Sequence, residues 1–244
     1  MTHKIILDTD PGIDDAMAIL FAEAHPAIDL LAITTVFGNA TIENGTRNAL
    51  WLKQKYGMKA DVAQGAAAPL LREPVGPTTV VHGPSGLGDV EAGEVTLAPD
   101  PRPAWQYIVE TVKTNPGELT LVTIGPRTNL ALALEAAPEI TALVKQVVVM
   151  GGAFGVNGHR GNVTPYAEAN IHDDPEAADR VFTAPWPVVI IGLDVTQQSF
   201  FSSAYLDALR DDAGEPGRFL WAVSRFYLRF YSERIGLNGC HVHD

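Results

Sequence analysis

Apolar and polar residues follow two periodicities along the chain, and these predict strands and helices in turn. Short β-branched runs predict strands, and apolar residues spaced three and four apart predict helices. The predicted strands are Lys4–Asp8, Ile28–Val36, Ala60–Gln64, Glu118–Ile124, Gln146–Met150 and Pro187–Asp194. The predicted helices are Ile13–His25, Thr41–Tyr56, Ala104–Thr114, Thr128–Ala136, Pro175–Thr183, Ser203–Arg210 and Arg218–Ile235. Alternation of this kind indicates βαβ units, so we expect an α/β fold with a mainly parallel, Rossmann-like central sheet flanked by helices.

Two stretches lack this periodicity. Pro69–Pro101 is rich in Gly and Pro, and Gly151–Asp173 is irregular. Long structureless segments inside a compact domain are usually functional or mobile. We find no repeat or linker, so we expect residues 1–244 to form a single domain.

Polar residues and tight turns follow the predicted strands. In open parallel sheets, ligands bind beyond the carboxyl ends of the strands. The segments at that edge are the Asp8–Asp15 run, Gly38-Asn39, Ile124-Gly125, the loop with Asn162, Glu168 and Asn170, and Asp194. We therefore expect the site at this edge of the sheet.

Composition and charge narrow the range of possible functions, partners and locations. The 17 Lys and Arg residues against 29 Asp and Glu give a net charge of −12, which argues against a nucleic-acid binder and against an anionic membrane surface as partner. The single cysteine, Cys240, excludes an internal disulfide and any CxxC site. Because the N-terminus carries no signal-peptide pattern and no apolar run is long enough to span a bilayer, we expect a cytoplasmic protein.

The strongest chemical feature is the run DTDPGIDD from Asp8 to Asp15, which places four carboxylates within eight residues. Such a run repels itself unless a cation lies among the carboxylates, and Ca²⁺ or Mg²⁺ is the natural partner. Zinc is disfavoured because no His/Cys set accompanies the run, and an EF-hand because Pro11 falls inside the loop and Ile19 takes the place of its final Glu.

Two other interpretations of the run stay open. Asp14 and Asp15 favour the start of a helix, and Asp8 and Asp10 are common turn residues, so the run has a purely structural interpretation. Asp8-Thr9-Asp10 also matches the DxD of a Mg²⁺-dependent haloacid-dehalogenase-type phosphatase, with Asp8 as nucleophile. That class needs a downstream lysine near the phosphate, and Lys145 instead opens a predicted strand.

The motif DTDPGIDDA resembles the N-terminal signature of the nucleoside hydrolase family, the inosine–uridine preferring type included. Seven further motifs in the family's order strengthen the resemblance over almost the whole chain. They are TTVFGN (34–39), VHGPSGLGD (81–89), GPRTNLA (125–131), VVVMGG (147–152), GNVTPYAEAN (161–170), DPEAA (174–178) and HVHD (241–244). The resemblance implies the nucleoside hydrolase fold and an enzyme that cuts the bond between ribose C1′ and a nucleobase.

The resemblance also implies a bound Ca²⁺ and assigns roles to residues. The implied calcium ligands are Asp10, Asp15, the main-chain carbonyl of Ile124 and Asp244. Asp10 is also the implied general base toward a calcium-bound water, and His243 the implied acid for the leaving base. The implied ribose contacts are Asp14, Asn39, Asn162, Glu168 and Asn170, and the implied base contacts are His82 and His243.

Partners and role follow from the same resemblance. It implies a small-molecule ribonucleoside as substrate, a role in purine and pyrimidine salvage, and a homo-oligomer, dimer or tetramer. The aromatic set on the predicted helix 218–235 has core spacing, although Tyr227 or Tyr231 lies near enough to the implied site to reach the base.

Two departures from the family pattern stand out. Arg127 replaces a commonly apolar residue in the GPRTN motif, and nothing in the sequence explains it. Family members also continue past the His-Asp pair, so we expect the domain to be incomplete at its C-terminal side. A catalytically weakened nucleoside- or ribose-binding protein of the same fold is therefore the main alternative, and the phosphatase is the lesser one.

Overall fold

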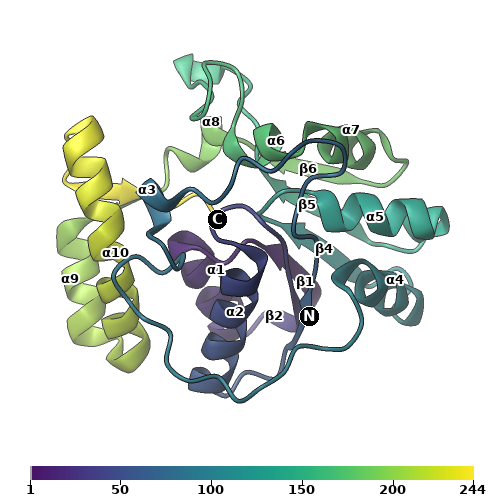
Figure 1. Cartoon of the computed structure of the whole chain (residues 1–244), viewed down its shortest axis with the longest axis horizontal. Helices are drawn as coiled ribbons and strands as arrows, with labels where there is room; N and C mark the ends of the chain where they lie inside the picture. Colours follow the sequence, from purple (N-terminus) through teal and green to yellow (C-terminus); the bar gives the residue numbers. More distant parts are fainter. Residues whose placement is uncertain (1) are drawn as a thin grey trace.

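The computed structural model describes residues 2–244. Its centre is a six-stranded parallel sheet of order β3-β2-β1-β4-β5-β6 (Figure 1). The strands are β1 (His3–Thr9), β2 (Ile28–Thr35), β3 (Asp61–Gln64), β4 (Leu119–Thr123), β5 (Gln146–Met150) and β6 (Val188–Ile191). The α/β fold with a mainly parallel sheet, predicted from the alternating pattern, is confirmed.

Helices cover both faces of this sheet. The principal helices are α1 (Ile13–Ala24), α2 (Ile42–Tyr56), α4 (Ala104–Thr114), α5 (Thr128–Ala136), α7 (Pro175–Thr183), α9 (Ser203–Asp212) and α10 (Gly214–Ile235). Figure 1 shows α4, α5 and α7 along one side, α1 and α2 on the other, and α9 and α10 as an outer pair beside α1. Right-handed crossovers account for this division, because the chain moves from β1 toward β3 first and toward β6 afterwards.

Short elements occupy the two stretches that lacked periodicity: α3 (Thr79–His82) in the first, and the 3₁₀ turn Val156–Gly158 and α6 (Ala169–Asp173) in the second. Two other short elements lie elsewhere, the 3₁₀ turn Pro138–Ala142 after α5 and α8 (Leu193–Thr196) after β6. A small antiparallel pair, β7 (Phe200–Ser202) with β8 (Gly239–His241), joins residues on either side of the α9–α10 hairpin. The predicted strand Pro187–Asp194 is shorter in the structure because Gly192 ends it and caps α8.

Two apolar cores hold the sheet between its helix layers. Ile5 and Leu7 of β1 pack on the α1 side, whereas Ile6 of the same strand packs on the α4–α5 side. This alternation follows from the two-residue period of a strand. None of the helices within residues 2–244 has both the length and the apolar character needed to cross a bilayer.

The sheet reverses its strand order between β1 and β4, and this reversal positions the site. Asp8 pairs in register with Thr34 of β2 and Thr123 of β4, so the carboxyl ends of these three strands lie side by side. Loops that leave neighbouring strands in opposite directions leave a crevice between them. The run that begins at Asp8 opens directly into that crevice.

Candidate active site

The β1–α1 turn buries all four of its carboxylates, none of which is more than 3% exposed. Asp15 caps its own helix, since Gly12 N–H donates to Asp15 Oδ2 at 2.8 Å. Thr9 Oγ1 donates to the other oxygen of Asp15, and Asn39 Nδ2 donates to Oδ2 at 2.9 Å. These donors hold an ionisable side chain in the interior, where an unpaired charge is costly.

Asp10 lies beside this group and has one pinned oxygen. The backbone N–H of Asn39 donates to Asp10 Oδ2 at 2.7 Å. Among the described residues, none donates to Asp10 Oδ1, which is buried. Burial and the neighbouring Asp15 raise the pKa of Asp10 well above its ordinary value.

Asp14, Asp15 and Asp244 form a carboxylate group that can hold a metal ion. One oxygen from each lies within 4.8 Å of the others. Burial and the neighbouring carboxylates raise the pKa of Asp15 and that of Asp244, and the pKa of Asp244 rises well above its ordinary value. A divalent cation removes this repulsion, and carboxylate oxygens are its preferred ligands. Asp10, an implied ligand, is not part of this group, whereas Asp14, an implied ribose contact, is. The group, with the Oδ1 atom of Asp14 unpaired among the described residues, fits a divalent cation such as Ca²⁺ or Mg²⁺.

Asp8 does not face the site, although it opens the run. Thr34 Oγ1 donates to Asp8 Oδ1 at 2.6 Å, and Asn129 Nδ2 donates to the same oxygen at 2.8 Å. Asp8 is 1% exposed, and burial raises its pKa to about 6. A nucleophile needs a free oxygen that faces substrate, so this environment argues against the phosphatase interpretation.

A cavity of about 510 Å³ lies over the carboxyl ends of β1, β4 and β5. It collects all the predicted substrate-contacting residues from separate segments: Asp14, Asn39, His82, Asn162, Glu168, Asn170 and His243. Ile124 and Asp244 also line it. Asp10 and Asp15 are not among the lining residues and lie behind Asn39, which bonds to both.

One wall of the cavity is built by the loop after β5. Glu168 caps α6 by accepting from the backbone N–H of Asn170 at 2.9 Å and of Ile171 at 3.1 Å. Asn170 Nδ2 donates to the carbonyl of Ile124 at 2.8 Å. Asn162 Oδ1 accepts from Ala169 N–H at 2.9 Å. The predicted ribose contacts on this loop therefore hold one another in place.

The opposite wall carries aromatic and imidazole groups from α3, α10 and the C-terminal segment. His82 Nδ1 accepts from the backbone N–H of Ile13 at 3.2 Å, and burial lowers the pKa of His82 to about 4. Tyr227 Oη donates to Asp14 Oδ2 at 3.2 Å. His243 pairs through Nδ1 with Thr196 Oγ1 at 2.8 Å and through Nε2 with Tyr231 Oη at 3.1 Å.

Sequence reasoning missed several members of this arrangement. It gave Tyr227 and Tyr231 core packing as the default, with either of them able to reach the base, and it did not single out Thr196 or Thr9. A helical spacing of aromatics looks the same whether the face meets a core or a cavity, so the spacing alone could not assign a role to the two tyrosines. Arg127 lies beneath the site with 0% exposure, and the only signal was its departure from the family motif.

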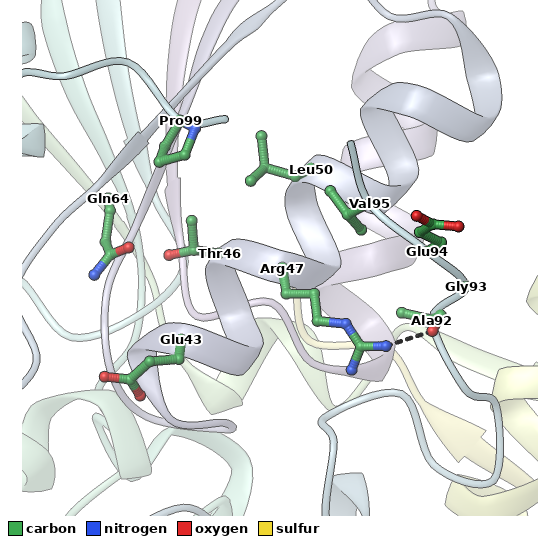
Figure 2. A pocket seen from close by; sticks show the side chains of 10 residues that line it. All are labelled: Glu43, Thr46, Arg47, Leu50, Gln64, Ala92, Gly93, Glu94, Val95 and Pro99. Atoms are coloured by element: carbon green, nitrogen blue, oxygen red, sulfur yellow. Dashed lines mark hydrogen bonds between the residues drawn. The ribbon is translucent and has the colours of Figure 1, made fainter. Parts of the chain in front are cut away.

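Two further cavities lie apart from the predicted substrate contacts, although Ile124 and Asp244 also line the second of them. One, of about 550 Å³, lies between α2 and the segment 92–99, where Arg47 donates to the carbonyl of Ala92 (Figure 2). The other, of about 760 Å³, is largely apolar and is lined from β1, β4, α1, α9 and α10. Neither collects the predicted substrate contacts, so the crevice at the strand reversal is the candidate site.

Fold and site together define an α/β enzyme with a metal-competent carboxylate site at the carboxyl ends of its strands. The family model described as inosine-uridine preferring nucleoside hydrolase matches residues 5–244. A probable uridine nucleosidase 1 of Oryza sativa subsp. japonica is 41% identical over 242 residues, which cover 99% of this chain and 74% of that protein.

Solved structures agree with this assignment. A plant nucleoside hydrolase superposes with a TM-score of 0.95 and 38% identity, covering 100% of this chain and 76% of that one. A purine-preferring ribonucleoside hydrolase from Gardnerella vaginalis gives 0.93 and 36%, covering 99% and 77%. The chain belongs to the inosine-uridine preferring nucleoside hydrolase family. It is an enzyme that hydrolyses ribonucleosides, as the motifs predicted.

Proposed function

We propose that this cavity releases ribose and free base from ribonucleosides, with Asp10 as general base and Ca²⁺ as the bound metal. One observation carries the proposal: a single cavity gathers every predicted substrate contact from five separate parts of the chain, directly over the buried carboxylates. Glycosidic cleavage passes through an oxocarbenium-like transition state, so anionic groups around the sugar stabilise the developing positive charge.

Asp10, Asp15, Asp244 and the carbonyl of Ile124 would hold the Ca²⁺. The proximity of Asp14 to Asp15 and Asp244 supports a site with high negative charge, and all donors are oxygens. Oxygen donors in this number suit Ca²⁺ or Mg²⁺ better than zinc. When bound, the metal would supply Lewis acidity that lowers the pKa of the attacking water.

Asp10 would take the proton from that water through its unpaired Oδ1. Its other oxygen is fixed by Asn39 N–H, which orients the carboxylate. Burial and the neighbouring Asp15 raise the pKa of Asp10 above its ordinary value before a cation is bound. The pinned carboxylate also keeps its position without the entropic cost of ordering it during the reaction.

The ribose hydroxyls would bind to Asp14, Asn39, Asn162, Glu168 and Asn170. Carboxylates accept two hydrogen bonds, and Asn both donates and accepts, so this set suits a cis-diol. His82 would contact the base. His243 would donate the proton that the departing base needs, and its bonds to Thr196 and Tyr231 orient its ring.

The nucleobase preference is the least determined part of the proposal. The relatives named above include a uridine nucleosidase and a purine-preferring hydrolase. We propose that both uridine and inosine enter the cavity, since its base-facing wall combines imidazole and phenol groups that serve either ring. Turnover numbers for the two substrates test this point.

A parallel assay tests the function and separates its alternatives. Ribose release is followed from inosine, uridine and cytidine with and without a calcium chelator, and phosphate release is followed from a generic monoester. We expect ribose release that the chelator abolishes, and no phosphate. Calcium binding and ribose binding without turnover would instead favour the weakened binding protein, and phosphate release would favour the phosphatase.

The domain organisation, location, assembly and metabolic role are part of the same proposal. We propose that the 244 residues act as one nucleoside hydrolase domain, in the cytoplasm, as a dimer or tetramer that serves purine and pyrimidine salvage. The support is the family membership together with the shared cores that join both halves of the sheet. Sedimentation analysis tests the assembly, and growth on nucleosides as the only source of pyrimidine or purine tests the role.

A further inference from the structure

Arg127 is the one Lys or Arg that is fully buried among residues 2–244, and it is the largest side chain with no exposure. It stands one position before α5, in the turn that follows β4. Burial lowers the pKa of its guanidinium, and the carboxylates of Glu168, Asp10, Asp8 and Asp244 oppose that effect. A buried cation is costly unless opposite charges and hydrogen-bond acceptors surround it.

The guanidinium joins the carboxyl ends of two adjacent strands. Nη1 donates to the carbonyl of Gly125, which follows β4, and Nη2 donates to the carbonyl of Met150, the last residue of β5. The backbone leaves room for it: Gly151 has φ +153°, and a Cβ there would lie 2.3 Å from Nη2. Lysine carries its donors on a single nitrogen and lacks the planar fork whose two nitrogens each reach one carbonyl.

Each of the two turns that Arg127 joins holds a residue of the proposed ribose site. The carbonyl of Ile124, next to Gly125, accepts from Asn170 Nδ2 at 2.8 Å. The N–H of Gly152, two residues after Met150, donates to Glu168 Oε2 at 3.0 Å. Movement of either turn would therefore move Asn170 or Glu168.

We propose that Arg127 is a positioning residue for ribose binding: its guanidinium fixes the β4 and β5 turns, and these fix Asn170 and Glu168. The inference rests on the proposed ribose-binding role of those two residues. Arg127 stands where the family motif commonly has an apolar residue, and the proposal gives this departure a function. The guanidinium holds the two turns by hydrogen bonds, an arrangement called the brace below, whereas an apolar side chain would only fill space.

Three variants test the brace: Arg127→Leu, Arg127→Lys and, as a control, Arg102→Leu. Arg102 binds Asp100 and Glu110 at the partly exposed surface of β3 and α4, away from the site. We expect Arg127→Leu to raise the inhibition constant of ribose and the KM for uridine by about tenfold. Arg127→Lys should recover part of the loss, because one ammonium can satisfy one carbonyl. Arg102→Leu should leave both constants unchanged.

Amide hydrogen exchange supplies a readout that needs no turnover. In Arg127→Leu, the amides of Gly152, Asn170 and Ile171, which donate to Glu168, should exchange about tenfold faster while those of β1 stay unchanged. A uniform increase over the whole chain would mean a loss of global stability only. Together with a wild-type ribose constant, it would overturn the inference.

The two hypotheses fail in different ways. A wild-type protein that releases no ribose from any nucleoside contradicts the proposed function, while the exchange of these three amides still decides the role of Arg127. If Arg127→Leu does not accumulate as folded protein, Arg127→Lys is measured alone with the same readouts. Wild-type exchange and a wild-type ribose constant in Arg127→Lys would then overturn the inference.

Discussion

The backbone N–H of Asn39 lies 2.7 Å from Asp10 Oδ2, and this bond fixes one oxygen of the proposed base while Oδ1 is left without a donor among the described residues. The bond joins the carboxyl end of β1 to the loop after β2. Its geometry depends on the residue before Asn39. Gly38 has φ +149°, and a Cβ there would lie 2.1 Å from Asp10 Oδ2.

Gly38→Ala should therefore disable the enzyme without touching the substrate. The methyl group would push the Asp10 carboxylate aside, and the backbone would be strained at a φ that favours glycine. We expect kcat for uridine to fall by about 100-fold or more. Gly57→Ala is the matched control: Gly57 also has positive φ, at the end of α2, but nothing lies within 4 Å of its Cβ position. It should cost about 1 kcal/mol of stability and leave kcat unchanged.

Removal of the metal should reduce both activity and stability. Without a cation, burial raises the pKa of Asp10, Asp15 and Asp244, and neighbouring carboxylates raise it further: Asp15 acts on Asp10, and Asp14 acts on Asp15 and Asp244. Ca²⁺ at about 100 times its Kd should stabilise the fold by about 2.7 kcal/mol. Thermal unfolding in chelator and in Ca²⁺ measures this shift. Equal melting temperatures, with full activity in chelator, would contradict the metal site.

His82 should make the fold less stable in acid. Burial lowers its pKa from 6.5 to about 4, so below pH 6.5 the unfolded chain takes up a proton that the folded chain refuses. The free energy of unfolding is therefore unaffected by this protonation above pH 6.5. It falls as the pH drops from 6.5 toward about 4, by roughly 1.4 kcal/mol per pH unit at most. Urea unfolding at about pH 7.5 and about pH 5 should show a smaller acid loss for His82→Gln than for wild type, by roughly 1–2 kcal/mol. Equal losses would mean that His82 ionises freely in the fold.

His243→Ala should slow release of the base more than binding of the sugar. General acids commonly contribute about 10²–10⁴ in rate, so we expect kcat for inosine to fall by about 100-fold or more. The inhibition constant of ribose should change by less than about threefold, because ribose lacks the leaving group. Tyr231→Phe removes the hydroxyl that bonds to His243 Nε2 and should give a smaller loss of kcat. A His243→Ala variant with unchanged kcat would remove His243 from the mechanism.

Much of the site could be predicted because its residues follow consecutive parallel strands. The carboxyl ends of β1, β2 and β4 lie side by side, so the residues that follow them, Asp10, Asn39 and Ile124, are brought to the same edge of the sheet. Residues whose place depends on tertiary packing could not be found this way. The meeting of Asp14 with Tyr227 joins α1 to α10, and no local pattern carries that contact.

The first two carboxylates of the run, Asp8 and Asp10, illustrate the same limit. Asp8 and Asp10 are two residues apart on an extended strand end, and successive side chains on one face look equivalent in sequence. In the structure, three polar side chains from β2, β4 and α5 bind Asp8, and its pKa is raised by burial rather than by the other site carboxylates. Only the hydrogen-bond partners from other elements distinguish Asp8, a buried structural residue, from Asp10, the proposed catalytic residue.

One comparison of wild type with a single variant tests whether Asp10 is the base of a nucleoside hydrolase. Ribose release from uridine is measured for wild type and for Asp10→Asn, both with saturating Ca²⁺. We expect a loss of about 10³-fold or more in the variant with an unchanged circular dichroism spectrum, because a neutral amide is easier to bury than a carboxylate and the fold stays intact. Near-wild-type ribose release by Asp10→Asn would contradict the account.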